Sequence, residues 1–165
     1  MTERWTRLEE FPDYSVSTYG QVASDRRDII LRQTLNLQGI PMVNLKRDGR
    51  PTTRSVPLLV ASAFIPNPDP ARFNSPIQLN GHRIDSHVDN LMWRPRWFAI
   101  KYHNQFHIED FYYVPQAEIL LLETDEVFKG FVDPSTKYGL HYRDIMFSYM
   151  NRHRVFPTNQ QFRLI

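Results

Sequence analysis

The sequence contains no cysteine and no long apolar run, and each absence excludes a class of protein. Without cysteine among its 165 residues, the chain has neither disulfide bonds nor thiolate metal ligands. No apolar stretch approaches the roughly 20 residues that a membrane-spanning helix needs. The first eleven residues carry five charges, where a signal peptide has its apolar core. We therefore expect a protein of the cytoplasm that is not secreted through a signal peptide.

The composition indicates a folded chain whose charge is unevenly distributed. Hydrophobic residues make up 41% and aromatic residues 13% of the sequence, which excludes a disordered protein. Residues 1–103 hold 14 Lys and Arg against 10 Asp and Glu, whereas residues 104–165 hold 6 against 8. A surface that binds phosphates is therefore expected in the first part of the chain.

The stretch from residue 56 to residue 103 has the clearest pattern. Val56–Phe64 is apolar without a breaker, which predicts one buried helix, and the prolines that follow force an extended loop. Pro76–Leu79 predicts a short strand that enters a tight turn at Asn80-Gly81. Arg94–His103 predicts a helix that starts at a proline.

This order of elements resembles the HNH endonuclease fold (ββα-metal) of phage and intron homing endonucleases. The residues that carry the resemblance are 63–68 (AFIPNP), Gly81, Asn90-Leu91 and Trp93. An HNH site needs a histidine that deprotonates water and oxygen or nitrogen ligands for one divalent cation. The family's four functional positions fall here on Pro57, Ile77, Gln78 and Ala99. Glutamine cannot act as a general base, so the resemblance implies an inactive nuclease without a metal or other cofactor; Mg²⁺ would be needed only if the core were active.

Neighbouring side chains offer an alternative set of ligands. His82, Asp85, His87 and His103 lie close to the lost positions in sequence. Neither His82 nor His87 has the paired spacing that metal sites show, which favours solvated loop histidines.

The N-terminal part resembles the nuclease-associated modular domain that precedes HNH cores. Tyr14–Ser24 (YSVSTYGQVAS) carries this match. Short strands are predicted at Val16–Tyr19, Gln21–Ala23, Ile29–Leu31 and Met42–Leu45, the last closing on a hairpin at Asp48-Gly49. The family context favours DNA contacts, while ordinary solvated hairpin tips are the alternative. The cations expected to contact DNA are Arg26, Arg27, Arg32, Lys46, Arg47, Arg50 and Arg54.

The C-terminal part resembles the helix-turn-helix repeat at the end of many homing endonucleases. The match rests on Glu123–Phe128, on Tyr138-Gly139-Leu140, on Ile145 and on Phe162-Arg163. The predicted order is strand 119–122, strand 127–128, helices 134–138 and 141–153 and strand 161–165, after a packed linker that includes three adjacent aromatic residues, 111–113. If this part binds DNA, Tyr142 and Arg143 enter the major groove. The apolar side chains of the same helix predict a protein partner instead: Met146, Phe147, Tyr149 and Met150.

The sequence as a whole predicts a small α+β modular protein. Four segments are expected: a β-rich nuclease-associated domain (1–54), a degenerate HNH-like core (55–103), a linker (104–115) and a helix-turn-helix-like module (116–165). The resemblance implies a catalytically inactive protein of phage origin that still binds double-stranded DNA in the cytoplasm of the host cell. The alternative is a fold adapted to protein interaction, as a virion component or an inhibitor of a host enzyme. An active metal-dependent HNH nuclease is the third hypothesis.

Overall fold

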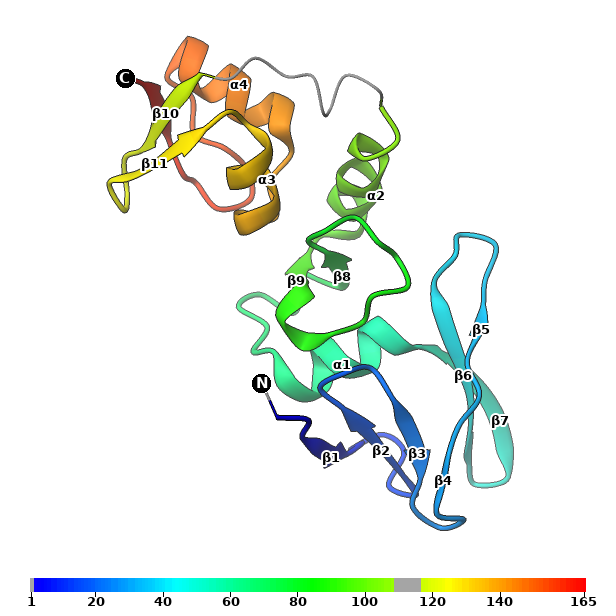
Figure 1. Cartoon of the computed structure of the whole chain (residues 1–165). Coiled ribbons are helices and arrows are strands. Elements are labelled where there is room, and N and C mark those ends of the chain that lie inside the picture. The colour runs from blue at the N-terminus through cyan, green and yellow to red at the C-terminus, as the bar shows by residue number, and fades with distance from the viewer. Residues whose placement is uncertain (1, 109–116) are drawn as a thin grey trace. The chain divides into compact units, whose positions relative to one another are not determined.

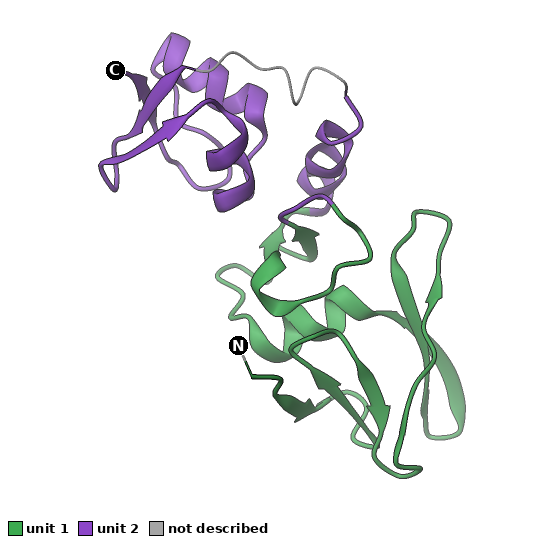
Figure 2. Ribbon diagram, in the orientation of Figure 1, with its two compact units in different colours: residues 1–78, 82–95 green, residues 79–81, 96–165 purple. Residues whose placement is uncertain are grey.

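The computed structural model describes residues 2–108 and 117–165, which form two compact units. Unit 1 comprises residues 1–78 and 82–95, and unit 2 comprises residues 79–81 and 96–165 (Figure 2). Both helices and strands contribute to each unit (Figure 1), and the predicted α+β class is confirmed. No described helix is long and apolar enough to cross a membrane.

Unit 1 begins with a four-stranded antiparallel sheet in the order β1-β2-β3-β4. Its strands are β1 (Trp5–Arg7), β2 (Tyr14–Ser17), β3 (Val22–Ser24) and β4 (Ile29–Ile30). Gly20 lies in the turn between β2 and β3 with a φ of +79°, and a Cβ atom there would stand 2.7 Å from the Cβ of Ser86. The turn therefore needs glycine for both its backbone conformation and its close packing.

A second sheet of unit 1 has the order β5-β6-β7. It consists of β5 (Thr34–Leu35), β6 (Pro41–Arg47) and β7 (Arg50–Ser55). Alternate residues of β6, among them Val43 and Leu45, are buried, as expected for a strand with one face on the core. The predicted hairpin at Asp48-Gly49 is confirmed, with φ angles of 51° and 76° at these two residues.

The HNH-like stretch of unit 1 packs against both sheets through its helix. It contains α1 (Val56–Phe64), β8 (Ser75–Gln78), the 3-10 turn η1 (Val88–Asn90) and β9 (Leu91–Arg94). The buried face of α1 contributes Val56, Leu59 and Val60 to the core, and Trp93 of β9 donates its indole N–H to the carbonyl of Ile65 at 3.0 Å. The helix predicted at Val56–Phe64 has the same bounds in the structure.

Unit 2 contains the last helix of the HNH-like stretch and the C-terminal part. Its elements are α2 (Arg96–Gln105), β10 (Glu118–Leu121), β11 (Glu126–Lys129), α3 (Val132–Tyr138), α4 (Tyr142–Asn151) and β12 (Phe162–Leu164). The sheet has the order β11-β10-β12, and Gly139 ends α3 in the left-handed conformation with a φ of 57°. Helix α2 continues to Gln105, two residues beyond the helix end predicted at His103. The aromatic residues predicted to pack in that linker, 111–113, lie outside the described residues.

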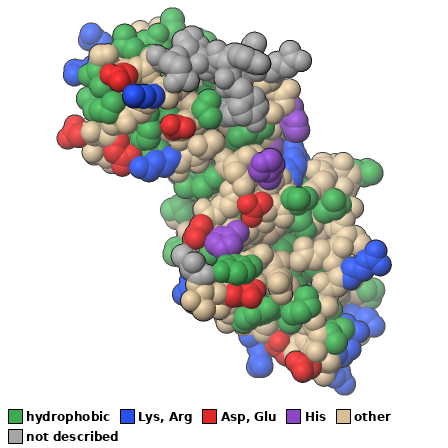
Figure 3. All heavy atoms as spheres, viewed as in Figure 1, with side chains coloured by type: hydrophobic (Ala, Val, Ile, Leu, Met, Phe, Trp, Pro, Cys, Tyr) green, Lys and Arg blue, Asp and Glu red, His purple; other side chains and the backbone are tan. Residues whose placement is uncertain are grey.

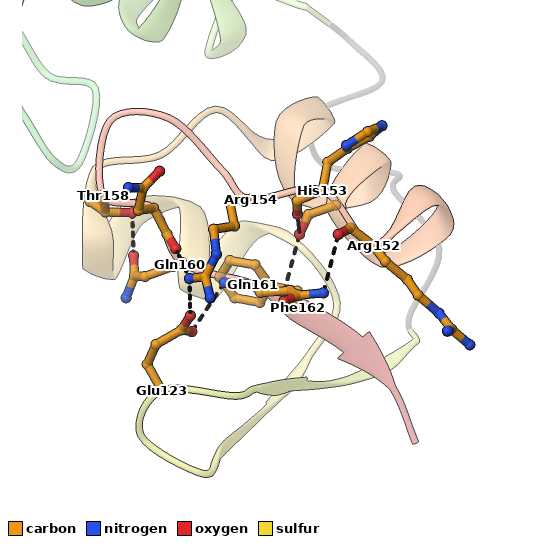
Figure 4. Close-up of polar contacts among 10 residues, drawn as sticks. Glu123, Arg152, His153, Arg154, Thr158, Gln160, Gln161 and Phe162 are labelled. Carbon is orange, nitrogen blue, oxygen red and sulfur yellow. Dashed lines mark hydrogen bonds and ion pairs between the residues drawn. The ribbon is translucent and has the colours of Figure 1, made fainter.

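The loop between α4 and β12 is tied to the turn between β10 and β11 (Figure 4). Glu123 accepts hydrogen bonds from Arg154 Nη1 at 3.1 Å and from the backbone N–H of Gln161 at 3.0 Å. The buried Ser148 hydroxyl of α4 accepts the backbone N–H of Phe162 at 3.2 Å. These contacts fix the chain direction as it enters β12.

Candidate nucleic-acid interface

The residues of unit 1 that are predicted to occupy HNH functional positions are packed into its interior. Ile77 is 0% exposed and Gln78 is 2% exposed, both on β8. The amide of Gln78 faces its own turn, where Nε2 donates to the carbonyl of Arg83 at 3.1 Å. Pro57 is buried in the first turn of α1. None of these three side chains presents a proton acceptor at the surface, where a DNA phosphate would bind.

The remaining counterpart position, Ala99, is 6% exposed on α2 of unit 2. HNH enzymes need a divalent cation, but the side chains of Ile77 and Ala99 have no donor atom, and Gln78 is 2% exposed with its Nε2 bound to the carbonyl of Arg83. Within residues 2–108 and 117–165, no group of three or more His, Cys, Asp or Glu side chains is arranged to hold a metal ion. The described residues therefore do not fit the metal of an HNH site.

The neighbouring histidines do not rebuild that site. His82 is exposed. His87 packs against Tyr19 with ring centroids 4.9 Å apart and planes tilted by 33°, and its Nδ1 accepts the backbone N–H of Asp89. His103 is only 8% exposed on α2, so the prediction of a solvated loop histidine is wrong at this position. Packing shields a side chain on the inner face of a helix from solvent, and the position of His103 in the sequence does not show that it lies on that face.

The cations predicted to contact DNA lie on the surface of unit 1. Six of the seven are exposed: Arg26, Arg27, Arg32, Lys46, Arg47 and Arg50. In the part of the chain that the structure describes, only Arg47 among these six forms an ion pair, at 3.9 Å from the carboxylate of Asp48. Figure 3 shows Lys and Arg side chains at the edge of the view where Figure 1 places β4, β6 and β7.

Arg54 differs from the other six cations. Its Nη2 lies 2.6 Å from Glu10 Oε1, and its guanidinium lies over the ring of Phe11, 5.2 Å from the ring centroid. Both contacts hold the side chain against unit 1, so Arg54 is less accessible to a phosphate than its exposed neighbours.

The residues of α4 that were predicted to contact DNA or a protein partner differ in how far they are exposed. Tyr142 is 3% exposed and belongs to the core of unit 2, which removes it from the candidate DNA contacts. Arg143 is exposed, and its Nε donates to the Tyr142 hydroxyl at 2.9 Å. Phe147 and Met150 are 58% and 62% exposed. Met146 and Tyr149 are half-buried against the core.

Helix α2 is joined to α3 and α4 by polar contacts inside unit 2. Gln105 is 0% exposed, and its Oε1 accepts the backbone N–H of Tyr142 at 3.1 Å and lies 3.3 Å from Ser135 Oγ. Residue 141 has no capping side-chain hydrogen bond, so Gln105 takes over that role for the first N–H of α4. Lys101 Nζ lies 2.7 Å from both carboxylate oxygens of Asp144 on α4.

His141 lies next to this ion pair and is held in its neutral form. It is 5% exposed, and its Nδ1 has no hydrogen-bond partner among the described residues. Burial, reinforced by the positive charge of Lys101, lowers the pKa of His141 to about 4. The imidazole is therefore uncharged at neutral pH.

Comparisons with known proteins agree with this architecture. The model of the NUMOD4 motif matches residues 3–46, which confirms the predicted nuclease-associated motif. Two relatives from Acanthamoeba polyphaga mimivirus are named Uncharacterized HNH endonuclease L247, 34% identical over 95 residues, and Uncharacterized HNH endonuclease L245, 26% identical over 93 residues. Each match covers 56% of this chain but only 24% and 27% of the relatives, so the chain spans about a quarter of their length.

A solved structure shares the fold. It is described as "DNA binding and cleavage by the HNH homing endonuclease I-HmuI", and it aligns over 98% of both chains with a TM-score of 0.55. The sequences are 17% identical, so this likeness concerns the fold alone. The motif, the relatives and the shared fold confirm the predicted resemblance to the HNH-type homing endonuclease family. The boundaries of the predicted modules stay predictions.

Two residues of interest were not identified from the sequence. Gln105 was assigned to a linker, and its partners are 30 and 37 residues away, so no local pattern marks it. Leu37 is 100% exposed, although leucine is an apolar residue. The polar Asn36 and Gln38 beside it and the following Gly39 were the available signal for an exposed turn.

Proposed function

We propose that this protein binds double-stranded DNA through unit 1 and does not cleave it. The observation that carries the proposal is the set of six exposed cations, five of which have no acidic partner among the described residues. Side chains of this kind are hydrated and ready to replace the counterions of a phosphate backbone. The loss of a base and of metal donors at the HNH counterpart positions supports the absence of cleavage, and no metal or other cofactor is part of the proposal.

The relatives support the DNA partner by their names, and their activity enters here only as a proposal. Two are named HNH endonucleases, and the solved structure is described as binding and cleaving DNA. Their source is a giant virus, so the proposed phage origin has no support from these two relatives. A location in the host cytoplasm follows from a DNA partner and is part of the proposal.

Salt dependence tests the DNA binding directly. We would measure the fluorescence anisotropy of a labelled duplex of about 30 base pairs at increasing salt, because each phosphate contact adds roughly 0.9 to the slope of log affinity against log salt. The Ala variant of Arg26, Arg27 and Arg50 should bind more weakly, with a slope shallower by up to about 3.

A matched variant controls for the change in net charge. It replaces three exposed cations of unit 2, Lys129, Arg152 and Arg163, with Ala. If unit 1 holds the interface, this control should keep the slope of the unmodified protein. Equal losses in both variants, or no binding at low salt, would reject the proposal.

A protein partner is the second candidate, favoured by the apolar surface of α4. Phe147 and Met150 lie on the same helix, and each of these large apolar residues is more than half exposed. Such side chains are common at the centre of protein interfaces. A protein that fails to bind any duplex, and whose stability is unchanged when Phe147 and Met150 are replaced by Ser, would favour this candidate.

A further inference from the structure

Strand β1 lies at one end of the four-stranded sheet of unit 1 (Figure 1). It pairs with β2 on one side, and no other strand in the described part of the chain pairs with its second side. The open side of an edge strand presents backbone N–H and C=O groups that can pair with another chain. This edge is therefore a candidate interaction surface.

Hydrogen bonds on either side of β1 show which of its residues face the open edge. Two bonds, each 2.9 Å long, join the neighbouring residues to the adjacent segment: Thr18 N–H to the Arg4 carbonyl and Leu8 N–H to the Tyr14 carbonyl. Because hydrogen bonding alternates along an antiparallel strand, Thr6, which lies midway between Arg4 and Leu8, also bonds to β2. The backbone N–H and C=O groups of Trp5 and Arg7 therefore point away from β2, toward the open edge.

The backbone of this edge is complementary to a second copy of itself. When two β1 strands pair in antiparallel fashion about a two-fold axis at Thr6, Trp5 of each copy lies opposite Arg7 of the other. Both outward-facing residues of each copy then exchange N–H···O=C bonds with the other copy. A shift of one residue sets outward groups against inward ones. A shift of two residues in either direction pairs only one outward residue of each copy.

The side chains match in the same register. Trp5 is 41% exposed, and the side chain of Arg7 is 69% exposed. An arginine opposite an indole is attracted by the π face of the ring, and the two Arg7 guanidinium groups stay diagonal to each other. On the other face of the sheet the two half-buried Thr6 side chains meet at the axis, and cross-strand threonine pairs are favourable.

We propose that two copies of this chain pair through β1, in antiparallel register with Thr6 on the two-fold axis. A second copy is favoured over an unrelated strand, because Trp5–Arg7 supplies both halves of a self-complementary pattern, as a two-fold interface requires. The contact between three-residue strands is small compared with a standard interface of about 1,600 Å², so the dimer dissociates readily. Pairing joins the exposed cations of two copies in one particle, but it does not itself require DNA.

A single introduced cysteine is a clean probe of this register, because the chain has no cysteine of its own. In the proposed pair the two Cα atoms of residue 6 lie about 4.5 Å apart, a separation that a disulfide can bridge. The two Cα atoms of residue 7 lie about 8–9 Å apart, which is too far. Under mild oxidation of the full chain without DNA, Thr6→Cys should form a covalent dimer roughly tenfold faster than Arg7→Cys, although residue 7 is the more exposed.

A second substitution tests the side-chain match. Trp5→Lys in the Thr6→Cys background sets two cations opposite each other, so it should slow the crosslinking several-fold. Ile30→Lys in the same background is the matched control, because Ile30 is 55% exposed on β4 at the other end of the sheet, and it should leave the rate unchanged. Circular dichroism would establish that each variant is folded.

Sedimentation of the unmodified protein gives a measurement that needs no cysteine. Its average mass should rise above that of the monomer as the concentration is raised, and Trp5→Lys should stay closer to the monomer mass. A constant monomer mass, or equally fast crosslinking of Thr6→Cys and Arg7→Cys, would overturn the proposed dimer. Since no DNA is present in these experiments, the proposed DNA binding is decided separately by its salt dependence.

Discussion

The Gln105→Met variant tests one of the contacts that join α2 to the C-terminal part within unit 2. Methionine keeps the length of the side chain but has no carbonyl, so the backbone N–H of Tyr142 loses its acceptor. The Ser135 hydroxyl has a single proton and already donates to the carbonyl of Leu140 at 2.6 Å, so it depends less on Gln105.

The cost of this substitution follows from the burial of the partners. A buried donor without an acceptor costs about 1–3 kcal/mol. The substitution also removes the Gln105 Nε2 atom, which is buried without a hydrogen-bond partner among the described residues, so part of that cost is recovered. We expect a net loss of about 1–2 kcal/mol in the unfolding free energy of unit 2.

Amide hydrogen exchange measured by NMR is the suitable assay, because it reports on unit 2 separately from unit 1. A loss of about 1.4 kcal/mol should speed exchange of the Tyr142 amide roughly tenfold. Asn104→Met is the control: Asn104 is exposed on the same helix, and this change should stay within about 0.5 kcal/mol. Unchanged exchange of Tyr142 in Gln105→Met, or equal acceleration in both variants, would refute the reasoning.

Two further predictions concern stability. Burial lowers the pKa of His141 to about 4, so the unfolded chain binds the proton more tightly than the folded chain. The free energy of unfolding is therefore highest above about pH 6.5 and falls as the pH is lowered toward 4, by at most about 3 kcal/mol. Urea unfolding of the His141→Leu variant should show a weaker pH dependence over this range, and an unchanged dependence would contradict the assignment. Gly81→Ala should destabilise the protein more than Gly49→Ala, although the two glycines have nearly the same φ angles, +77° and +76°. A Cβ atom at residue 81 would lie 2.4 Å from the Phe106 ring, whereas at residue 49 none of the described atoms lies within 4 Å of it. The strain common to both is about 1–2 kcal/mol, and equal melting temperatures would show that Phe106 moves without cost.

Local patterns were sufficient to predict several elements. The helix at Val56–Phe64 was readable because an apolar run ends at a proline-rich loop, and the Asp48-Gly49 turn because few residues tolerate its positive φ angles. These features depend on residues near one another in the chain.

Features that depend on tertiary packing were not predictable in the same way. Tyr142 begins a helix whose polar and apolar residues alternate irregularly, so its burial became apparent only from the core that surrounds it. The continuation of α2 to Gln105 likewise depends on contacts with residues more than 25 positions away. Side-chain exposure therefore separated the candidate DNA contacts of unit 1 from the buried tyrosine that the sequence had grouped with them.

The central claim is that the protein binds duplex DNA without cutting it, and one gel tests both parts. Supercoiled plasmid would be incubated with increasing protein in the presence of Mg²⁺ or Mn²⁺, and half of each sample would be deproteinised before electrophoresis. We predict that the untreated samples migrate more slowly, while the deproteinised plasmid remains supercoiled. Nicked or linear plasmid that depends on the metal would contradict the claim of inactivity, and an unshifted plasmid at low salt would contradict the claim of binding.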